Sequence, residues 1–187
     1  MRTGAYPGSF DPPTVAHLAI AGAAIAQCDL DRVDLVISEV ALGKSDHHVR
    51  LADRFTVLGR IADRDPRLGA AVTPHRLLVD IAAGYDVVVM GADKWAQVAD
   101  PEWYGGRVAR DEALAALPLL AVAPRPGAEV PDGAVVLEVE PTHGSVSSTA
   151  ARAGAHDLMA PEAAAFAAAT GAWIDAERYA RWLAGDT

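Results

Sequence analysis

Cysteine is almost absent from this chain of 187 residues, in which Cys28 is the only one. A single cysteine excludes a disulfide framework and a thiolate metal site, so we expect Cys28 to pack as a small apolar side chain. Long hydrophobic runs are lacking too: the N-terminus has no apolar region typical of a signal peptide, and no run approaches membrane-spanning length. We therefore expect a cytoplasmic protein.

Positive charge is also scarce. The chain has 16 Lys and Arg against 25 Asp and Glu, a net charge of −9 and a pI near 5.0, and its lysines are Lys44 and Lys94 alone. This balance argues against nucleic acid and against anionic membranes as partners. A small anionic substrate remains compatible with it, provided that the few basic residues converge locally.

The chain is long and apolar enough for one globular domain over residues 1–187, with a helical C-terminal part at about 146–187. Short β-branched runs alternate with Ala- and Leu-rich segments, which predicts an α/β fold with a Rossmann-like, doubly wound parallel sheet and C-terminal helices. We expect strands at 2–6, 33–37, 70–73, 85–90, 119–123 and 134–139, and helices at 15–27, 50–63, 75–83, 107–117, 161–170 and 175–183.

Five loops each follow a predicted strand, at residues 8–17, 38–48, 91–103, 124–127 and 142–152. In a doubly wound sheet, ligands bind outside the carboxyl ends of the strands, near the point where the strand order reverses. These loops should therefore meet at one edge, and motifs within them carry more weight than motifs elsewhere.

The first motif is the segment 6–17, which reads as a strand, a turn through Gly8, Ser9 and Phe10, and a helix start capped by Thr14. Such a turn offers backbone N–H groups and the positive end of the helix dipole to a phosphate. Thr14 and His17 share one helix face, where both can donate to charge that develops in phosphoryl or nucleotidyl transfer. The alternative is a capped helix with an incidental histidine.

The second motif lies at residues 144–152. Ser147, Ser148 and Thr149 supply a cap and N–H groups at a helix start, and Arg152 follows one turn later. This set suits a triphosphate tail, with the Arg152 guanidinium forked onto its oxygens. The alternative is a serine-rich cap beside a solvated arginine.

Together these motifs resemble a known family. Gly8-Ser9-Phe10-Asp11-Pro12 and Thr14-Val15-Ala16-His17 resemble the GxFDP and (H/T)xGH signatures of the nucleotidyltransferase superfamily, with Ala16 where the family usually has Gly, and 147–152 is similar to its SSTxxR motif. The resemblance implies catalytic roles for His17, Thr14 and Lys44, the last as a lysine that contacts the transferred phosphate. A solvated loop lysine is the alternative for Lys44.

Two branches of the superfamily compete. The opening from Tyr6 to Pro12 looks like phosphopantetheine adenylyltransferases, whereas Gly91-Ala92-Asp93 and Arg125-Pro126-Gly127 are similar to nicotinate-nucleotide (nicotinamide-nucleotide) adenylyltransferases. The second branch implies that Gly91 and Asp93 bind nucleotide and that Trp103 and Arg125 bind the acceptor. Trp103 lies two residues beyond the usual spacing, and Trp95 competes with it for the stacking role.

The resemblance implies adenylyl transfer from ATP to a phosphorylated acceptor, with nicotinate mononucleotide favoured. The rivals are transfer to 4′-phosphopantetheine or another phosphorylated metabolite, and a non-catalytic nucleotide-binding regulator. Mg²⁺ should arrive with ATP, held by phosphates and water rather than by a protein cage. We expect His47 and His48 at the surface rather than on a metal, and a homo-oligomer stays open.

Overall fold

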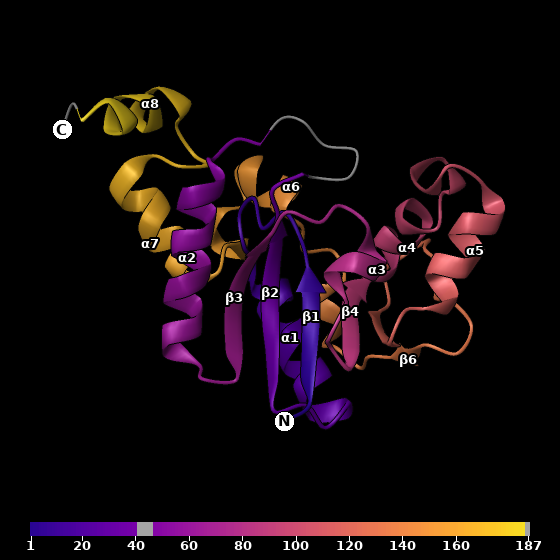
Figure 1. Cartoon of the computed structure of the whole chain (residues 1–187). Helices are drawn as coiled ribbons and strands as arrows, with labels where there is room; N and C mark the ends of the chain where they lie inside the picture. Colours follow the sequence, from indigo (N-terminus) through magenta and orange to yellow (C-terminus); the bar gives the residue numbers. More distant parts are fainter. Residues whose placement is uncertain (41–46, 186–187) are drawn as a thin grey trace.

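The structure is a computed structural model that describes residues 1–40 and 47–185. Its centre is a six-stranded parallel sheet in the order β3-β2-β1-β4-β5-β6 (Figure 1). The strands are β1 (Thr3–Pro7), β2 (Arg32–Ser38), β3 (Leu68–Thr73), β4 (Val87–Gly91), β5 (Leu119–Ala123) and β6 (Val135–Val136). The predicted doubly wound α/β fold is confirmed, and the strand order reverses between β1 and β4, where such folds bind ligands.

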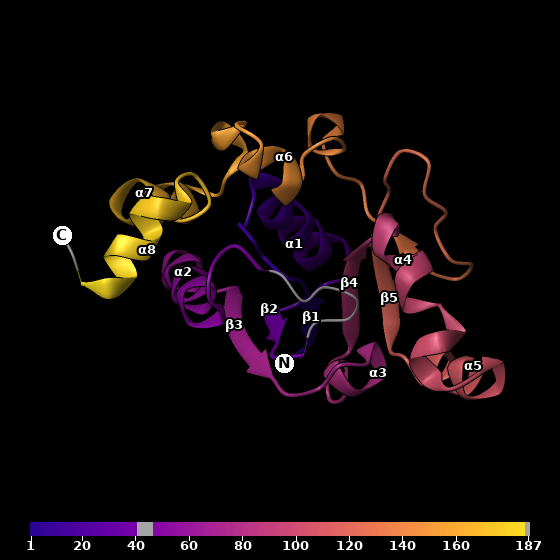
Figure 2. The same ribbon diagram turned by 90° about the horizontal axis from the view of Figure 1, so that it is seen from above.

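Helices cover both faces of the sheet. They are α1 (Val15–Gln27), α2 (Leu51–Arg64), α3 (Leu78–Ile81), α4 (Ala92–Val98), α5 (Arg107–Ala115), α6 (Ser148–Arg152), α7 (Pro161–Thr170) and α8 (Ala176–Ala184), with 3-10 turns η1 (Pro101–Tyr104), η2 (Pro141–His143) and η3 (His156–Leu158). Seen from above, α1 lies on one side of the sheet and α3 on the other (Figure 2). None of the helices in residues 1–40 and 47–185 combines the length and apolarity that a membrane span requires.

Strand β4 shows how the two cores are divided. Val87 and Val89 join the larger cluster with α1, α2 and α7, whereas Val88 and Met90 join a second cluster with α3 and α4. Successive side chains of a strand point to opposite faces, so a run of apolar residues is what a strand buried on both faces requires. Cys28 packs in the larger cluster, as expected.

Two predicted elements differ from the structure. The expected helix at 75–83 shrinks to α3, because the His75 N–H donates to the Thr73 hydroxyl in a turn before the helix begins. The expected loop at 91–103 is wrong: it contains α4 and η1. Ala92 and Gln97 are good helix formers, and the apolar face with Trp95 and Val98 packs against the second cluster.

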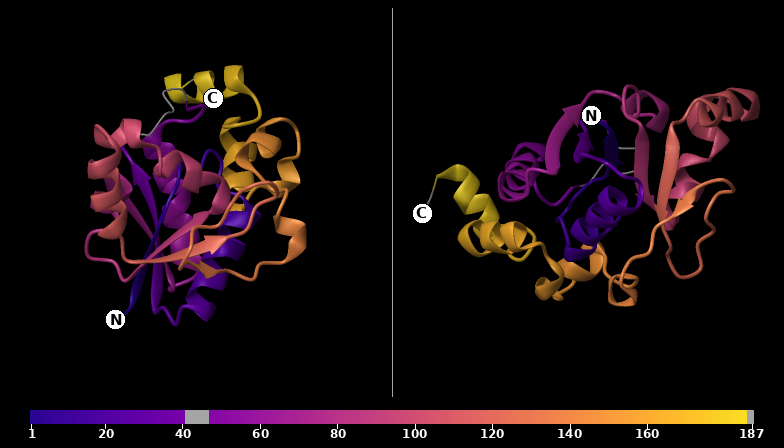
Figure 3. Two further views of the ribbon diagram at one scale, coloured as in Figure 1. Left: turned by 90° about the vertical axis from the view of Figure 1, so that its right-hand side faces the viewer. Right: turned by 90° about the horizontal axis from the view of Figure 1, so that it is seen from below.

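The C-terminal segment is tied to the first motif. Met159 forms an antiparallel bridge with Thr14, and the Ala160 N–H donates to the Pro13 carbonyl at 3.0 Å. Figure 3 shows α8, in yellow, at the end of the molecule opposite the N-terminus, on the side toward which the carboxyl ends of the strands point. The helices after the sheet therefore buttress the edge at which the motifs meet.

Candidate active site

Two adjoining cavities open at the carboxyl ends of β1 and β4, one of about 500 Å³ and one of about 110 Å³. The larger cavity takes residues from all five predicted loops, and the loop at 38–48 contributes His47. The two cavities share a wall formed by Pro7, Gly8, Ser9, His47, Met90 and Lys94. Two ligands bound side by side would meet at this shared wall.

The turn after β1 is built by packing as well as by backbone geometry. The Gly8 N–H donates to the Val36 carbonyl at 3.0 Å, and a Cβ on Gly8 would lie 2.9 Å from the Phe10 ring. Phe10 itself has a φ of 46° and is 1% exposed, so its ring is a core group and only its backbone is offered to the cavity. The ring packs edge-on against His17 at 5.1 Å between centroids.

His17 lines the larger cavity and is oriented by Thr14. The His17 Nδ1 atom accepts the Thr14 N–H at 3.0 Å and lies 2.7 Å from the Thr14 hydroxyl oxygen. The hydrogen-bond network thus assigns the neutral tautomer with its proton on Nε2. Thr14 is fully buried and contacts His17 rather than the cavity, so it acts as a positioning residue.

The charge state of His17 follows from its surroundings. Burial of the ring, and then the positive charges of Arg125 and Lys94, lower its pKa to about 4. At neutral pH the ring is therefore uncharged, and its Nε2–H is a hydrogen-bond donor to the cavity rather than an acid or a cation.

Asp11 connects several parts of the site. Its buried carboxylate accepts the Trp173 indole N–H at 2.7 Å and the His48 backbone N–H at 3.1 Å, and Arg152 Nη1 lies 3.9 Å from it. The indole comes from the C-terminal segment, in which Trp173 has a φ of 65°. A bulky residue in this left-handed region is strained, and it persists where the surrounding packing fixes it.

The second motif takes its predicted place on the wall of the larger cavity. The Ser147 hydroxyl accepts the Ala150 N–H at 3.1 Å and caps α6, whereas the Ser148 hydroxyl donates to the Pro12 carbonyl at 2.8 Å. Arg152 donates from Nη1 to the Asp11 carbonyl, and its Nη2 is 3.5 Å from the Thr149 hydroxyl. These bonds join the two motifs, although they are 136 residues apart from Pro12 to Ser148.

Gly91 and Asp93 also line the larger cavity, together with Arg125. A Cβ on Gly91 would lie 2.5 Å from the Asp93 carboxylate, so a larger residue there would displace this exposed side chain. Arg125 Nη1 donates to the carbonyls of His143 and Gly144, both at 2.9 Å, and its Nε is 3.7 Å from Asp93. Arg125 thus braces the segment before α6 and is not among the described residues that line the smaller cavity.

Trp103 lies at the border of the smaller cavity without lining it; its neighbour Tyr104 does line it. The Arg76 guanidinium lies over the Trp103 ring, 4.7 Å from the centroid. Trp103 Nε1 is buried and has no hydrogen-bond partner among the described residues. Trp95 packs against the second apolar cluster.

Several residues of the site were not predicted from the sequence. His47, expected at the surface, lines both cavities, and its Nδ1 lies 3.7 Å from Asp11. Lys94 and Arg54 line the smaller cavity as well, and Arg54 donates from Nη1 to the Ser9 carbonyl. Of these three residues, only Lys94 could have been found from the sequence, since it directly follows the Gly-Ala-Asp motif. Lys44, predicted to be catalytic, lies outside the described residues.

Comparisons with known proteins agree with this arrangement. A curated relative, "Probable nicotinate-nucleotide adenylyltransferase" from Caulobacter sp. (strain K31), is 34% identical over 109 residues, which cover 51% of this chain and 57% of that protein. The match thus spans little more than half of the relative's length. A solved structure, Plasmodium falciparum nicotinic acid mononucleotide adenylyltransferase complexed with NaAD, has a TM-score of 0.67 at 13% identity over 93% of this chain and 98% of its own. At that identity, the likeness shows the fold.

The model of the cytidylyltransferase-like family matches residues 5–154. This range contains β1 from Ala5 onward, the other five strands, both sequence motifs and every described residue of the two cavities. The chain therefore belongs to the cytidylyltransferase-like family of nucleotidyltransferases.

Proposed function

We propose that the protein transfers an adenylyl group from ATP to nicotinate mononucleotide, which forms a dinucleotide and releases pyrophosphate. The observation that carries this proposal is the pair of adjoining cavities with a common wall at Gly8, Ser9, His47 and Lys94. ATP would lie in the larger cavity and the acceptor in the smaller one, so that the acceptor phosphate and the α-phosphate of ATP face each other at the shared wall.

In this reaction an oxygen of the acceptor phosphate forms a bond to the α-phosphorus of ATP, and the bond from that phosphorus to the bridging oxygen breaks. The attacking oxygen is already anionic, so no protein base is required. The contribution of the protein is to position both phosphates and to stabilise the charge of the transition state. A neutral His17 suits this role, because it donates Nε2–H without taking a proton from the nucleophile.

Three basic groups would offset the charge of the triphosphate. Lys94, Arg125 and Arg152 line the larger cavity. Arg152 is fixed by its bond to the Asp11 carbonyl, so little side-chain entropy is lost when it binds a phosphate. The β- and γ-phosphates would lie against Arg152 and the N–H groups near Thr149, and the α-phosphate near His17.

Mg²⁺ would enter this site with ATP. Within residues 1–40 and 47–185, no group of three or more His, Cys, Asp or Glu side chains is arranged to hold a metal ion. In the proposed reaction the ion would take its ligands from phosphate oxygens and water, and when bound it would neutralise phosphate charge.

The choice of nicotinate mononucleotide is supported by the Gly-Ala-Asp motif on the cavity wall and by the name of the Caulobacter relative, a probable nicotinate-nucleotide adenylyltransferase. The size of the smaller cavity also agrees: at about 110 Å³ it is comparable to the cavity of about 150 Å³ that binds benzene. One flat ring would occupy it, with the ribose and phosphate toward the shared wall.

The test is a comparison of kcat/KM for nicotinate mononucleotide, nicotinamide mononucleotide and 4′-phosphopantetheine, each with ATP and Mg²⁺, followed by pyrophosphate release. We expect the highest value for nicotinate mononucleotide. Turnover of 4′-phosphopantetheine without turnover of either pyridine nucleotide would refute the proposal in favour of the phosphopantetheine branch.

A further inference from the structure

The charges that line the smaller cavity are all of one sign. The chain has a net charge of −9, yet no Asp or Glu is among the described residues that line this cavity. Three cationic side chains line it instead, those of Arg54, Arg76 and Lys94. The larger cavity, by contrast, includes Asp11 and Asp93. A cation-lined cavity in an acidic protein indicates an anionic occupant, because the positive charges repel one another unless an anion binds between them.

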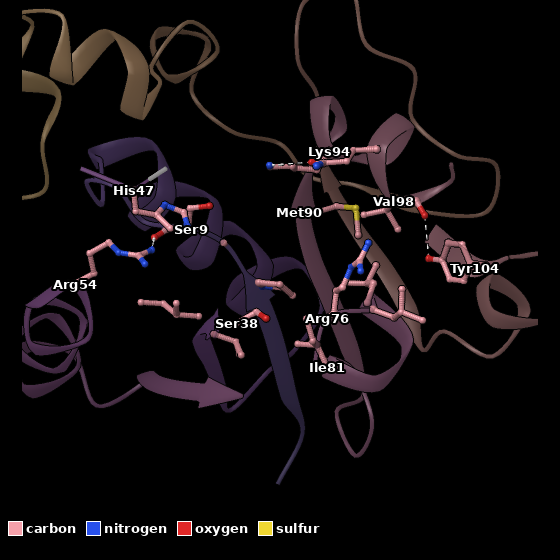
Figure 4. A pocket seen from close by; sticks show the side chains of 17 residues that line it. Ser9, Ser38, His47, Arg54, Arg76, Ile81, Met90, Lys94, Val98 and Tyr104 are labelled. Carbon is pink, nitrogen blue, oxygen red and sulfur yellow. Dashed lines mark hydrogen bonds between the residues drawn. The ribbon is translucent and has the colours of Figure 1, made fainter. Parts of the chain in front are cut away.

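These cations do not form one cluster. Figure 4 shows Arg54 on the same side as Ser9 and His47, whereas Arg76 lies on the other side, toward Val98 and Tyr104. Arg54 is fixed near the turn after β1, where it donates to the carbonyls of Ser9 and Val49. The occupant should therefore carry negative charge at two separated ends.

Arg76 is held in a way that leaves its donors available. The face of its guanidinium lies over the Trp103 ring at 4.7 Å, and no carboxylate of the described residues lies within ion-pair distance of it. A cation–π contact uses the face of the guanidinium and leaves its N–H groups, which point outward in the guanidinium plane, for a carboxylate. Tyr104 is anchored beside this pair through its hydroxyl, which donates to the Val98 carbonyl at 2.9 Å.

We propose that Arg76, seated on Trp103, determines the acceptor by binding a second anionic group, the ring carboxylate, at the end opposite the reacting phosphate. This inference rests on the proposed function and deepens it, since it selects the acid form over the amide form. It also disfavours acceptors with a neutral tail. Arg125, the arginine that the sequence favoured for this role, lines the larger cavity instead, and its Nη1 donates to the carbonyls of His143 and Gly144.

The experiment compares kcat/KM for nicotinate mononucleotide and nicotinamide mononucleotide in the wild type, Arg76→Met and Arg76→Lys. Met keeps most of the length of the side chain and removes its charge and donors. We expect the acid-to-amide ratio to fall about 10- to 100-fold in Arg76→Met, the loss of one charge-assisted contact, mainly through a higher KM for the acid. Arg76→Lys should keep a preference for the acid. Arg181→Met, which changes an exposed arginine on α8, is the matched control and should leave the ratio unchanged.

The outcomes separate this inference from the proposed function. A ratio within threefold of the wild type in Arg76→Met, with the acid still turned over, would overturn the role of Arg76 and leave the proposed function standing. A wild type that turns over neither pyridine nucleotide would overturn the proposed function, and the role of Arg76 with it. Arg76 is exposed, so the variant should fold, and a thermal unfolding curve checks this.

Discussion

The role of His17 gives the sharpest quantitative prediction. His17→Ala removes the Nε2–H donor that this ring directs at the larger cavity, since its Nδ1 is already occupied by the N–H and the hydroxyl of Thr14. Deletion of a single donor to transition-state charge lowers kcat by about 10²–10³-fold, or about 2.7–4 kcal/mol. We expect a loss in this range, with little change in KM for ATP, because the donor acts on charge that develops during transfer.

A graded variant sharpens this prediction. Thr14→Val removes the hydroxyl but keeps the backbone N–H that also binds Nδ1, so the tautomer is retained. One hydrogen bond has a net value of about 0.5–1.5 kcal/mol, so we expect a fall in kcat of about tenfold or less.

The assay is pyrophosphate release with ATP, Mg²⁺ and nicotinate mononucleotide, and His75→Ala is the control. His75 is exposed and lines neither cavity, so its removal should leave turnover unchanged. Turnover of His17→Ala within fivefold of the wild type would refute the assignment of the donor. A His17→Ala protein that fails to fold would mean that the ring is needed for packing against Phe10 rather than for transfer.

Three further predictions concern stability. Because the folded-state pKa of His17 is about 4, the unfolded chain takes up a proton first as the pH falls below about 6.5, which lowers the free energy of unfolding by about 2–3 kcal/mol by pH 4.5. This decrease should be smaller in His17→Asn, as urea unfolding at pH 7 and pH 4.5 would show. Gly8→Ala should cost about 1–3 kcal/mol, because its Cβ would lie 2.9 Å from the buried Phe10 ring, and thermal unfolding measures this. Trp173→Phe should cost about 1.5–3 kcal/mol and raise KM for ATP, because it removes the N–H bound to the buried Asp11 carboxylate.

Matched controls exist for the last two changes. A Cβ at Gly22 of α1 would meet nothing within 4 Å, so Gly22→Ala should stabilise the helix by roughly 0.5–1 kcal/mol, opposite in sign to Gly8→Ala. Trp182 packs on Tyr179 and Phe166 in the same C-terminal segment, so Trp182→Phe should affect stability but not KM for ATP. Equal shifts of KM in both tryptophan variants would contradict a specific role for the bond to Asp11.

Much of the fold could be predicted because local signals and topology agree. Helix α1 has its predicted bounds, since Thr14 caps it and it ends at Gln27, before Cys28 and Asp29, the latter with a φ of 52°. Helix α4 was missed because the end of β4 and the Gly-Ala-Asp motif favoured a loop. The helix depends instead on the contact of its apolar face with the second cluster, which is a tertiary effect.

The residues of the candidate site also fall into those that the sequence could place and those whose positions depend on tertiary packing. The convergence of the strand-end loops follows from a parallel sheet, so Gly8, His17 and Arg152 could be placed near one another from the sequence alone. The positions of Arg54 and Arg76 could not, because each depends on how a neighbouring helix packs against the sheet. The bonds of Arg125 to backbone carbonyls likewise depend on a turn that no local pattern predicts.

The central claim is that the adenylyl group, rather than the terminal phosphate, leaves ATP and joins a pyridine mononucleotide. The most direct test follows two labelled forms of ATP, one at the α-phosphate and one at the γ-phosphate, with nicotinate mononucleotide and Mg²⁺. We predict that the α-label enters a dinucleotide product and that the γ-label appears in pyrophosphate. A γ-label transferred to the acceptor, or an α-label that never leaves the adenosine phosphates of the donor, would contradict the account.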